Sequence, residues 1–321
     1  MNQIHIEKLN PVFVMGCQRS GTTMIASQLG APRSSIALPE LPFIISLLKA
    51  ELKDYPAHHT FQNLINHRKF NTLEITIKYE EFALAWEYKQ AKGIIELIVN
   101  KYLTAKNVVL PDLDVFNWIE HCPTNIDNFY LLKHFFPKAK FIHIVRDPRA
   151  VYASMKHLAR WNVSEPIKLS MTWIRTVSKG YLLKTKYPNS IAQIKYEEYV
   201  KDSSVLTGLC EFLQIKYSED MLNGGGVMLP EFTQKQHKLT MGKATTTKLS
   251  SWKNKITAKE DDAIKFFCHE WMVEFEYLDE EYLTSEPSAH DKRVWRLKSF
   301  FLDTRAKIVD KLVLKGVIRA S

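Results

Sequence analysis

Four short runs of apolar residues, each of strand length, set the pattern of the chain. They occupy positions 12–15, 108–110, 141–145 and 191–194. Between them apolar residues recur at the three- and four-residue spacing of helices, above all across positions 43–105. Strands that are apolar throughout are buried on both faces, and strands that alternate with helices form parallel sheets. The pattern therefore predicts an α/β fold, in which helices cover both faces of a parallel sheet.

The first apolar run leads into a turn that contains two glycines. Residues 16–23 read GCQRSGTT, and residues 24–29 have a helical pattern. A strand, a glycine-bearing turn and a helix in this order form a phosphate cradle, because backbone N–H groups and the positive end of the helix dipole meet there. The spacing is that of a P-loop, but Thr22 replaces the P-loop lysine and the charge lies at Arg19. The sheet is therefore predicted to be P-loop-like, with a phosphate site unsuited to ATP or GTP.

A second anion site is predicted after the run at 141–145. Arg146 ends this strand, Asp147 is a good helix N-cap, and Pro148 is a good first helical residue. Ser154 follows the cap by about two helical turns and faces the same way. An arginine and a hydroxyl in this arrangement suit a phosphate, although a structural salt bridge of Arg146 is the alternative. Two phosphate sites without the P-loop lysine indicate a bisphosphorylated nucleotide.

Composition and charge narrow the classes of partner. The chain has 321 residues, a net charge of +9 and a pI near 9.1. A basic excess favours anionic partners, unless it serves solubility alone. The four cysteines are scattered along the chain and contain no C-x-x-C pair. This spacing excludes a disulfide framework and a zinc signature, and we expect no metal site. The sequence shows no signal-peptide pattern and no apolar run of membrane-spanning length, so we expect a cytoplasmic setting.

Two segments together resemble a known family. Residues 14–23 resemble the 5′-phosphosulfate loop of sulfotransferases that use 3′-phosphoadenosine 5′-phosphosulfate (PAPS), and residues 140–154 resemble that family's 3′-phosphate motif. Residues 194–199 are similar to its segment beside the adenine, and residues 249–253 to a late motif that closes over the nucleotide. The resemblance covers about residues 11–280. It leans towards the membrane-type and bacterial branch, which includes carbohydrate and tyrosylprotein sulfotransferases.

The resemblance implies PAPS as donor, adenosine 3′,5′-bisphosphate (PAP) as product, and no metal. Negative charge grows on the oxygen that bridges to the leaving phosphate, and Arg19 with the loop amides is expected to stabilise it as part of catalysis. The implied donor contacts are Arg19, Ser20, Gly21, Thr22 and Thr23 at the 5′-phosphosulfate, Arg146 and Ser154 at the 3′-phosphate, Tyr196 at the adenine, and Ser250 and Trp252 in the closing motif.

Two residues compete for the role of general base. Glu40 lies soon after the cradle helix, where related membrane-type enzymes place a glutamate. His121 lies where many relatives carry the lysine of a Lys-Thr-Pro triplet, and it suits either a base or an imidazolium that stabilises charge. We expect Glu40 first and His121 second. The alternatives are a solvated loop acid for Glu40 and a structural histidine for His121.

The acceptor is expected to be a hydroxyl, first on a glycan, from the branch resemblance and the basic charge. A peptide tyrosine is the second expectation, because Arg19, Glu40 and Ser250 also fit the tyrosylprotein pattern. The rival readings are a P-loop kinase, which Thr22 and the lack of a clear Walker B acid disfavour, and a non-catalytic polyanion-binding module. No nucleic acid partner is expected.

The domain plan places a sulfotransferase domain at 1–286 and a basic tail at 287–321. A helical insertion at about 43–105 is expected to shape the acceptor cleft, and the glycines at 224–226 to form a flexible break. From residue 291 the tail has nine Lys and Arg against three Asp, with apolar residues at roughly helical spacing. This predicts a helix docked on the domain, which we favour over a peripheral membrane contact.

Overall fold

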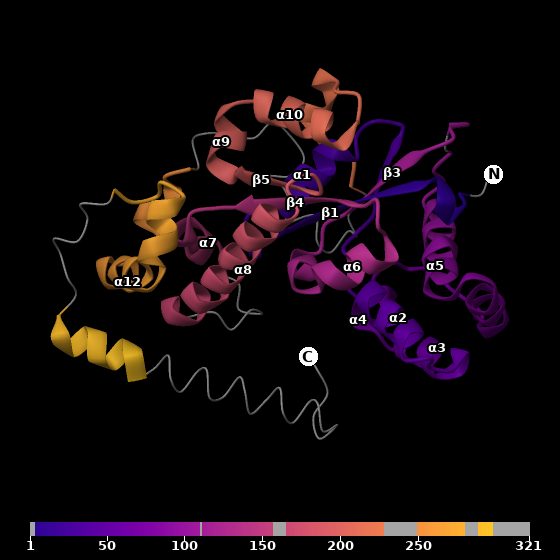
Figure 1. Ribbon diagram of the computed structural model, residues 1–321, viewed down its shortest axis with the longest axis horizontal. Helices are drawn as coiled ribbons and strands as arrows, with labels where there is room; N and C mark the ends of the chain where they lie inside the picture. Colours follow the sequence, from indigo (N-terminus) through magenta and orange to yellow (C-terminus); the bar gives the residue numbers. More distant parts are fainter. Residues whose placement is uncertain (1–3, 110, 157–164, 228–248, 280–287, 298–321) are drawn as a thin grey trace. The chain divides into compact units, whose positions relative to one another are not determined.

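The chain divides into two units. One contains residues 1–145 and 179–246, and the other contains residues 146–178 and 247–321. The structure is a computed structural model, shown in Figure 1. It describes residues 4–109, 111–156, 165–227, 249–279 and 288–297.

A five-stranded parallel sheet forms the centre of the first unit and confirms the predicted fold class. The strand order is β2-β3-β1-β4-β5, so β1 lies in the middle. The chain adds β2 and β3 on one side of β1 and then β4 and β5 on the other. Ligands of such sheets bind where the strand order reverses, which here is the carboxyl end of β1. The strands are β1 (Leu9–Gly16), β2 (Ser35–Ala37), β3 (Phe116–Glu120), β4 (Lys140–Val145) and β5 (Ile191–Lys195).

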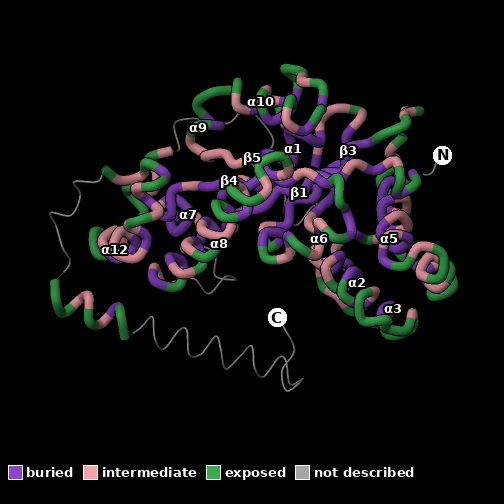
Figure 2. The backbone as a smooth tube through the Cα atoms, viewed as in Figure 1, coloured by how far each residue is buried: buried purple, intermediate pink, exposed green. Residues whose placement is uncertain are grey.

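Helices cover both faces of this sheet. Figure 1 shows α1, α9 and α10 on one face and α6 on the other. Strands β1 to β4 are buried along most of their length, whereas β5 is buried at Ile191 and half-buried beyond it (Figure 2). The helices of the first unit are α1 (Thr22–Leu29), α2 (Phe43–Leu52), α3 (Ala57–Ile65), α4 (Arg68–Asn71), α5 (Tyr79–Ala105), α6 (Phe129–Phe135), α9 (Tyr196–Lys201) and α10 (Ser204–Leu213).

The segment 43–105 is helical, as predicted, and consists of α2 to α5. These helices share one hydrophobic core with β1, through residues such as Leu47 and Ile94. Helix α5 contains a break at Gln90, whose φ of 49° and ψ of −132° are not helical. Glu51 caps the new helical start there, because its Oε2 accepts from Ala91 N at 2.9 Å. The insertion is therefore part of the sheet's own domain.

Three local predictions were wrong. Residues 108–109 form no strand, and Val109 is 79% exposed. The strand of this region is β3, whose polar residues interrupt its apolar pattern. Residues 31–42 contain three prolines, which predict a loop, but strand β2 forms within them. The glycines at 224–226 are no free break, since Gly226 N donates to Ser27 O of α1 at 2.9 Å.

The second unit contains α7 (Pro148–Met155), the first part of α8 (Pro166–Lys186), the 3-10 helix η7 (Ser251–Asn254) and α12 (Ala258–Glu274). The predicted start of α7 is confirmed, because the side chain of Asp147 accepts from Arg149 N at 2.8 Å as an N-cap. Among the described residues, no helix combines the length and apolar character of a membrane span.

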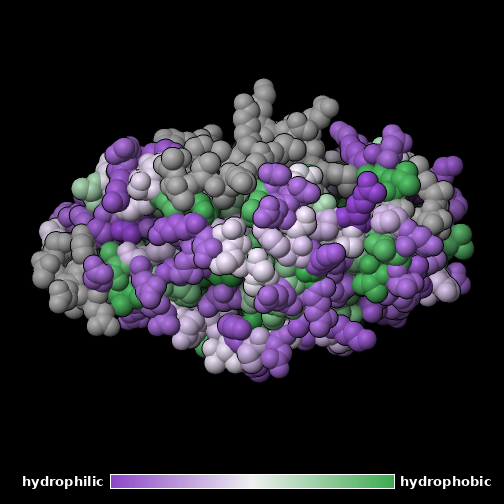
Figure 3. Space-filling model, turned by 90° about the horizontal axis from the view of Figure 1, so that it is seen from above, coloured by the Kyte–Doolittle hydropathy of each residue, from purple (hydrophilic) through white to green (hydrophobic). Residues whose placement is uncertain are grey.

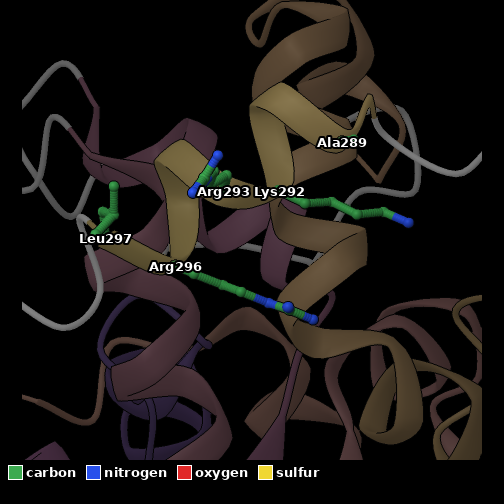
Figure 4. A pocket seen from close by; sticks show the side chains of 5 residues that line it. All are labelled: Ala289, Lys292, Arg293, Arg296 and Leu297. Atoms are coloured by element: carbon green, nitrogen blue, oxygen red, sulfur yellow. The ribbon is translucent and has the colours of Figure 1, made fainter.

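The first part of the basic tail is a helix over residues 289–297. Trp295 is buried against Ile167 and Ala263, so this segment docks on its own unit, as favoured from the sequence. Its basic side chains line an open hollow of about 490 Å³ (Figure 4). The predicted boundary at 286 and the tail beyond residue 297 lie outside the described residues and stay predictions. Hydrophilic residues cover most of the coloured surface in Figure 3.

Candidate active site

The cradle has the predicted strand, turn and helix. Strand β1 ends at Gly16 and α1 begins at Thr22. Two residues of the turn have left-handed backbone, Arg19 with a φ of 67° and Gly21 with a φ of 104°. Gly21 is the N-cap, and its carbonyl accepts from Met24 N at 3.1 Å. The turn thus presents the start of α1 at the carboxyl end of the central strand, where an anion is favoured.

Tyr196 lies directly against the cradle. It begins α9 immediately after β5, at the same edge of the sheet. A Cβ atom added to Gly21 would lie 2.7 Å from Cδ2 of the Tyr196 ring. The structure thus brings together two of the predicted donor contacts that are far apart in sequence.

Ser20 supplies a test of whether this cradle suits a phosphate. Its side chain is fully buried, and among the described residues its Oγ has no hydrogen-bond partner. A buried hydroxyl without a hydrogen bond lowers the stability of the fold unless a bound ligand supplies the hydrogen-bond partner. Thr22 and Thr23 are also buried, at the first turn of α1. A phosphate oxygen of a donor nucleotide would supply the missing acceptor, so these residues fit such a group.

A buried carboxylate lies at the end of the neighbouring strand β3. Glu120 is 3% exposed, and its oxygens accept from Leu41 N and Cys122 N, each at 3.1 Å, and from Asn125 Nδ2. Burial raises the pKa of this carboxyl, against the opposing effects of the His121 side chain and the donor groups. The sequence analysis did not identify Glu120.

Both candidate bases lie next to residues of this carboxylate's surroundings: His121 directly follows Glu120, and Glu40 directly precedes Leu41, whose N–H donates to Glu120. His121 is 1% exposed, and neither of its ring nitrogens has a hydrogen-bond partner in the part of the chain that the structure describes. Glu40 precedes Leu41 and forms an ion pair with Lys69 of α4, with Oε2 and Nζ 2.9 Å apart. Glu40 is therefore partly buried and paired, and is not a freely solvated loop acid.

The remaining predicted contacts belong to the second unit. Arg146 is the first residue after β4, and its carbonyl accepts from Trp173 Nε1 at 2.9 Å. Trp252 lies under the guanidinium of Arg149, 4.3 Å from it. Arg149 also forms a forked ion pair with Asp147, and so fastens the Trp252 segment to the start of α7. Within this unit Arg149 was missed from the sequence. The other predicted contacts here are Ser154, in α7, and Ser250, at the N-cap of η7.

Substitution of Gly21 by alanine is expected to lower donor affinity by at least about tenfold, because the added Cβ meets the Tyr196 ring and the φ of 104° disfavours a side chain. Titration with PAP by calorimetry measures this effect. In the double variant Gly21→Ala/Tyr196→Leu the clash is reduced, and part of the affinity is expected to return. Gly208→Ala, at a site with open space, is the matched control. Unchanged PAP affinity in Gly21→Ala would contradict the close contact.

Comparison with known proteins identifies the family. A sequence profile described as the Sulfotransferase family matches residues 11–219, which contain the cradle, Tyr196, strands β2 to β5 and all but the first two residues of β1. The chain belongs to the sulfotransferase family.

The sulfotransferase has curated relatives in nematodes. It is 28% identical over 148 residues to a putative protein-tyrosine sulfotransferase of Caenorhabditis elegans, covering 42% of the chain and 57% of the relative. A putative protein-tyrosine sulfotransferase of Caenorhabditis briggsae is 27% identical over 148 residues, covering 42% of the chain and 53% of the relative. The chain thus spans a little over half the length of these relatives.

Solved structures share the fold. The sulfotransferase domain from the Synechococcus PCC 7002 olefin synthase aligns with a TM-score of 0.57 at 21% identity, covering 85% of the chain and 96% of the domain. The sulfotransferase domain from the curacin biosynthetic pathway aligns with a TM-score of 0.54 at 17% identity, covering 84% of the chain and 98% of that domain. At these identities the likeness concerns the fold.

Proposed function

We propose that this sulfotransferase moves a sulfuryl group from PAPS to an acceptor hydroxyl and releases PAP. The observation that carries the proposal is the cradle itself. It has P-loop geometry, Thr22 in place of the P-loop lysine, and a buried Ser20 hydroxyl that a phosphate oxygen would complete. Family membership supports the same donor.

Each group in the proposed reaction has a definite task. The cradle N–H groups and the Arg19 side chain stabilise the charge that develops on the leaving 5′-phosphate. A base, Glu40 first and His121 second, accepts the proton of the acceptor hydroxyl as the new S–O bond forms. By their motifs, the further donor contacts are Thr23 at the 5′-phosphosulfate, Arg146 and Ser154 at the 3′-phosphate, Tyr196 at the adenine, and Ser250 and Trp252 in the closing segment.

Two acceptor classes are proposed. The names of the two nematode relatives support a tyrosine in a peptide. The sequence predicts a glycan hydroxyl, from its branch resemblance and its net charge of +9. Since a phenol loses its proton far more readily than a sugar alcohol, a tyrosine acceptor depends less on the base. The two classes therefore differ in how strongly loss of the base should reduce turnover.

Incubation of the full chain with ³⁵S-labelled PAPS, a panel of tyrosyl peptides and a panel of glycans tests the proposal. Label transferred to one class identifies it. Calorimetry with PAP, ATP and GTP tests the donor in parallel, and only PAP is expected to bind tightly. Absence of both transfer and PAP binding would overturn the proposal. PAP binding without transfer to any acceptor would favour the polyanion-binding module.

A further inference from the structure

Glu120 is the buried carboxylate of this site whose task the reaction leaves unexplained. It ends β3, and its register partner on β1 is Phe13, three residues before the cradle begins at Gly16. Burying an ionised carboxylate carries a large desolvation cost that only good partners offset. Among the described residues, its hydrogen-bond partners are uncharged N–H groups rather than a lysine or arginine. A buried carboxylate of this kind adds little to the free energy of unfolding by itself. We therefore look for its role in holding the groups that donate to it.

The partners of Glu120 belong to two loops that carry the two candidate bases. Leu41, which donates to Oε1 at 3.1 Å, directly follows Glu40. Cys122, which donates to both oxygens at 3.1 Å, directly follows His121. One carboxylate therefore fixes the backbone beside both bases. On the other side, the Glu40 side chain is held by Lys69 at 2.9 Å.

We propose that Glu120 is a positioning residue that fixes Glu40 and His121 relative to the cradle, an inference that rests on the proposed sulfuryl transfer. Three donor groups converge on its two oxygens, and an ionised carboxylate has acceptor capacity on both. A glutamine of the same shape keeps one oxygen and turns an NH₂ group towards a donor. In the place of Oε1 that NH₂ group meets the N–H groups of Leu41 and Cys122, and in the place of Oε2 it meets Asn125 Nδ2 and the Cys122 N–H. At least one hydrogen bond is therefore lost without a change in volume.

The substitution Glu120→Gln tests this role. The substitution is expected to displace the base by up to about 1 Å, and a displacement of this size is expected to lower kcat by about 10- to 100-fold. PAP affinity is expected to stay within about twofold of the parent, because the cradle glycines Gly16 and Gly21 lie against Ile144 of β4 and Tyr196 of α9, and the hydrogen bonds of Glu120 go to Leu41, Cys122 and Asn125. Glu81→Gln, which changes a half-buried carboxylate paired with Lys101, is the matched control and should leave both quantities unchanged.

A second substitution tests the hydrogen-bond network itself. In Glu120→Gln/Asn125→Asp the new amide N–H can donate to the new carboxylate, so the lost contact is restored with donor and acceptor exchanged. We expect this double variant to recover most of the kcat that Glu120→Gln loses. Where Glu120→Gln does not fold, Asn125→Ala replaces it, with an expected kcat loss of about three- to tenfold at unchanged PAP affinity.

Three results would each overturn the inference and leave the sulfuryl transfer intact. The first is a Glu120→Gln variant, or an Asn125→Ala variant in its place, that turns over at the parent rate. The second is a loss of PAP binding as large as the loss of kcat, which would make Glu120 a support of the cradle. The third is a double variant no more active than Glu120→Gln. Failure of the proposed function is distinct, because the parent protein itself would then neither bind PAP nor transfer sulfate.

Discussion

Replacing Arg19 with glycine is expected to lower the rate of sulfuryl transfer by about 10²- to 10³-fold and to leave the protein folded. The side chain carries the only formal positive charge of the GCQRSGTT turn, and loss of such a charge removes stabilisation of the leaving phosphate. Glycine is the informative replacement because Arg19 has a φ of 67°, where an alanine would add strain of its own. Transfer kinetics with labelled PAPS and thermal denaturation of the same samples measure the two effects separately.

The matched control for Arg19→Gly is Asn107→Gly. Asn107 is an exposed residue that also has a left-handed backbone, with a φ of 53°. It tests whether relief of left-handed strain by itself changes activity, and we expect parent rates. An Arg19→Gly variant that transfers sulfate at the parent rate would show that the loop amides suffice, and the catalytic role given to Arg19 would then be wrong.

Replacing Glu40 with glutamine is expected to reduce kcat by about 10²- to 10⁴-fold, because the amide cannot take the proton of the acceptor hydroxyl. PAP affinity is expected to stay near the parent value, since Glu40 is not among the donor contacts. Glutamine also leaves Lys69 without its ion-pair partner. The variant Lys69→Met therefore serves as the control, and it should retain far more activity than Glu40→Gln.

His121→Asn supplies the opposing test. Asparagine keeps a polar side chain at the end of β3 but cannot accept a proton at neutral pH. With Glu40 as the base, we expect His121→Asn to retain most of the turnover. The reverse pattern, in which Glu40→Gln is active and His121→Asn is inactive, would assign the base to His121. A steady-state comparison of both variants at saturating PAPS, with the acceptor found in the panel, decides between them.

The parts of the fold that the sequence predicts are those with strong local signals. The start of α7 follows from Asp147 and Pro148, which cap a helix whatever lies around them. The strands β1, β4 and β5 contain the largely apolar runs at 12–15, 141–145 and 191–194, which only His143 and Gln193 interrupt. Strand β3 reads FNWIE, and its Asn117 is explained by a non-local contact, because its Oδ1 accepts from Asn10 Nδ2 of β1 at 3.0 Å. Such pairing across the sheet has no local signature.

In the site, too, residues with a local sequence signal were predicted and residues that depend on burial or on distant contacts were not. Backbone conformation and glycine spacing mark the cradle in the sequence, and the family motif marks Tyr196. Glu120 is one acidic residue among many until its burial is known, and the available signal is a charged residue directly after the mostly apolar segment at 116–119, which Asn117 interrupts. Arg149 belongs to the Arg-Asp-Pro-Arg motif, but its stacking on Trp252 joins residues about a hundred positions apart.

The central position of β1 also sets the order in which the newly made chain can fold. Its residues pair with β3 from Phe116 onwards and with β4 from Lys140 onwards, although β1 itself begins at Leu9. At about 5–20 residues per second on the ribosome, β1 waits several seconds for its first neighbour. The local contacts of α2 to α5 are available earlier. The strand that carries the phosphate cradle is thus without both of its neighbouring strands while about the next hundred residues are made, and the backbone N–H and C=O groups along its two edges stay unpaired with other strands for that time.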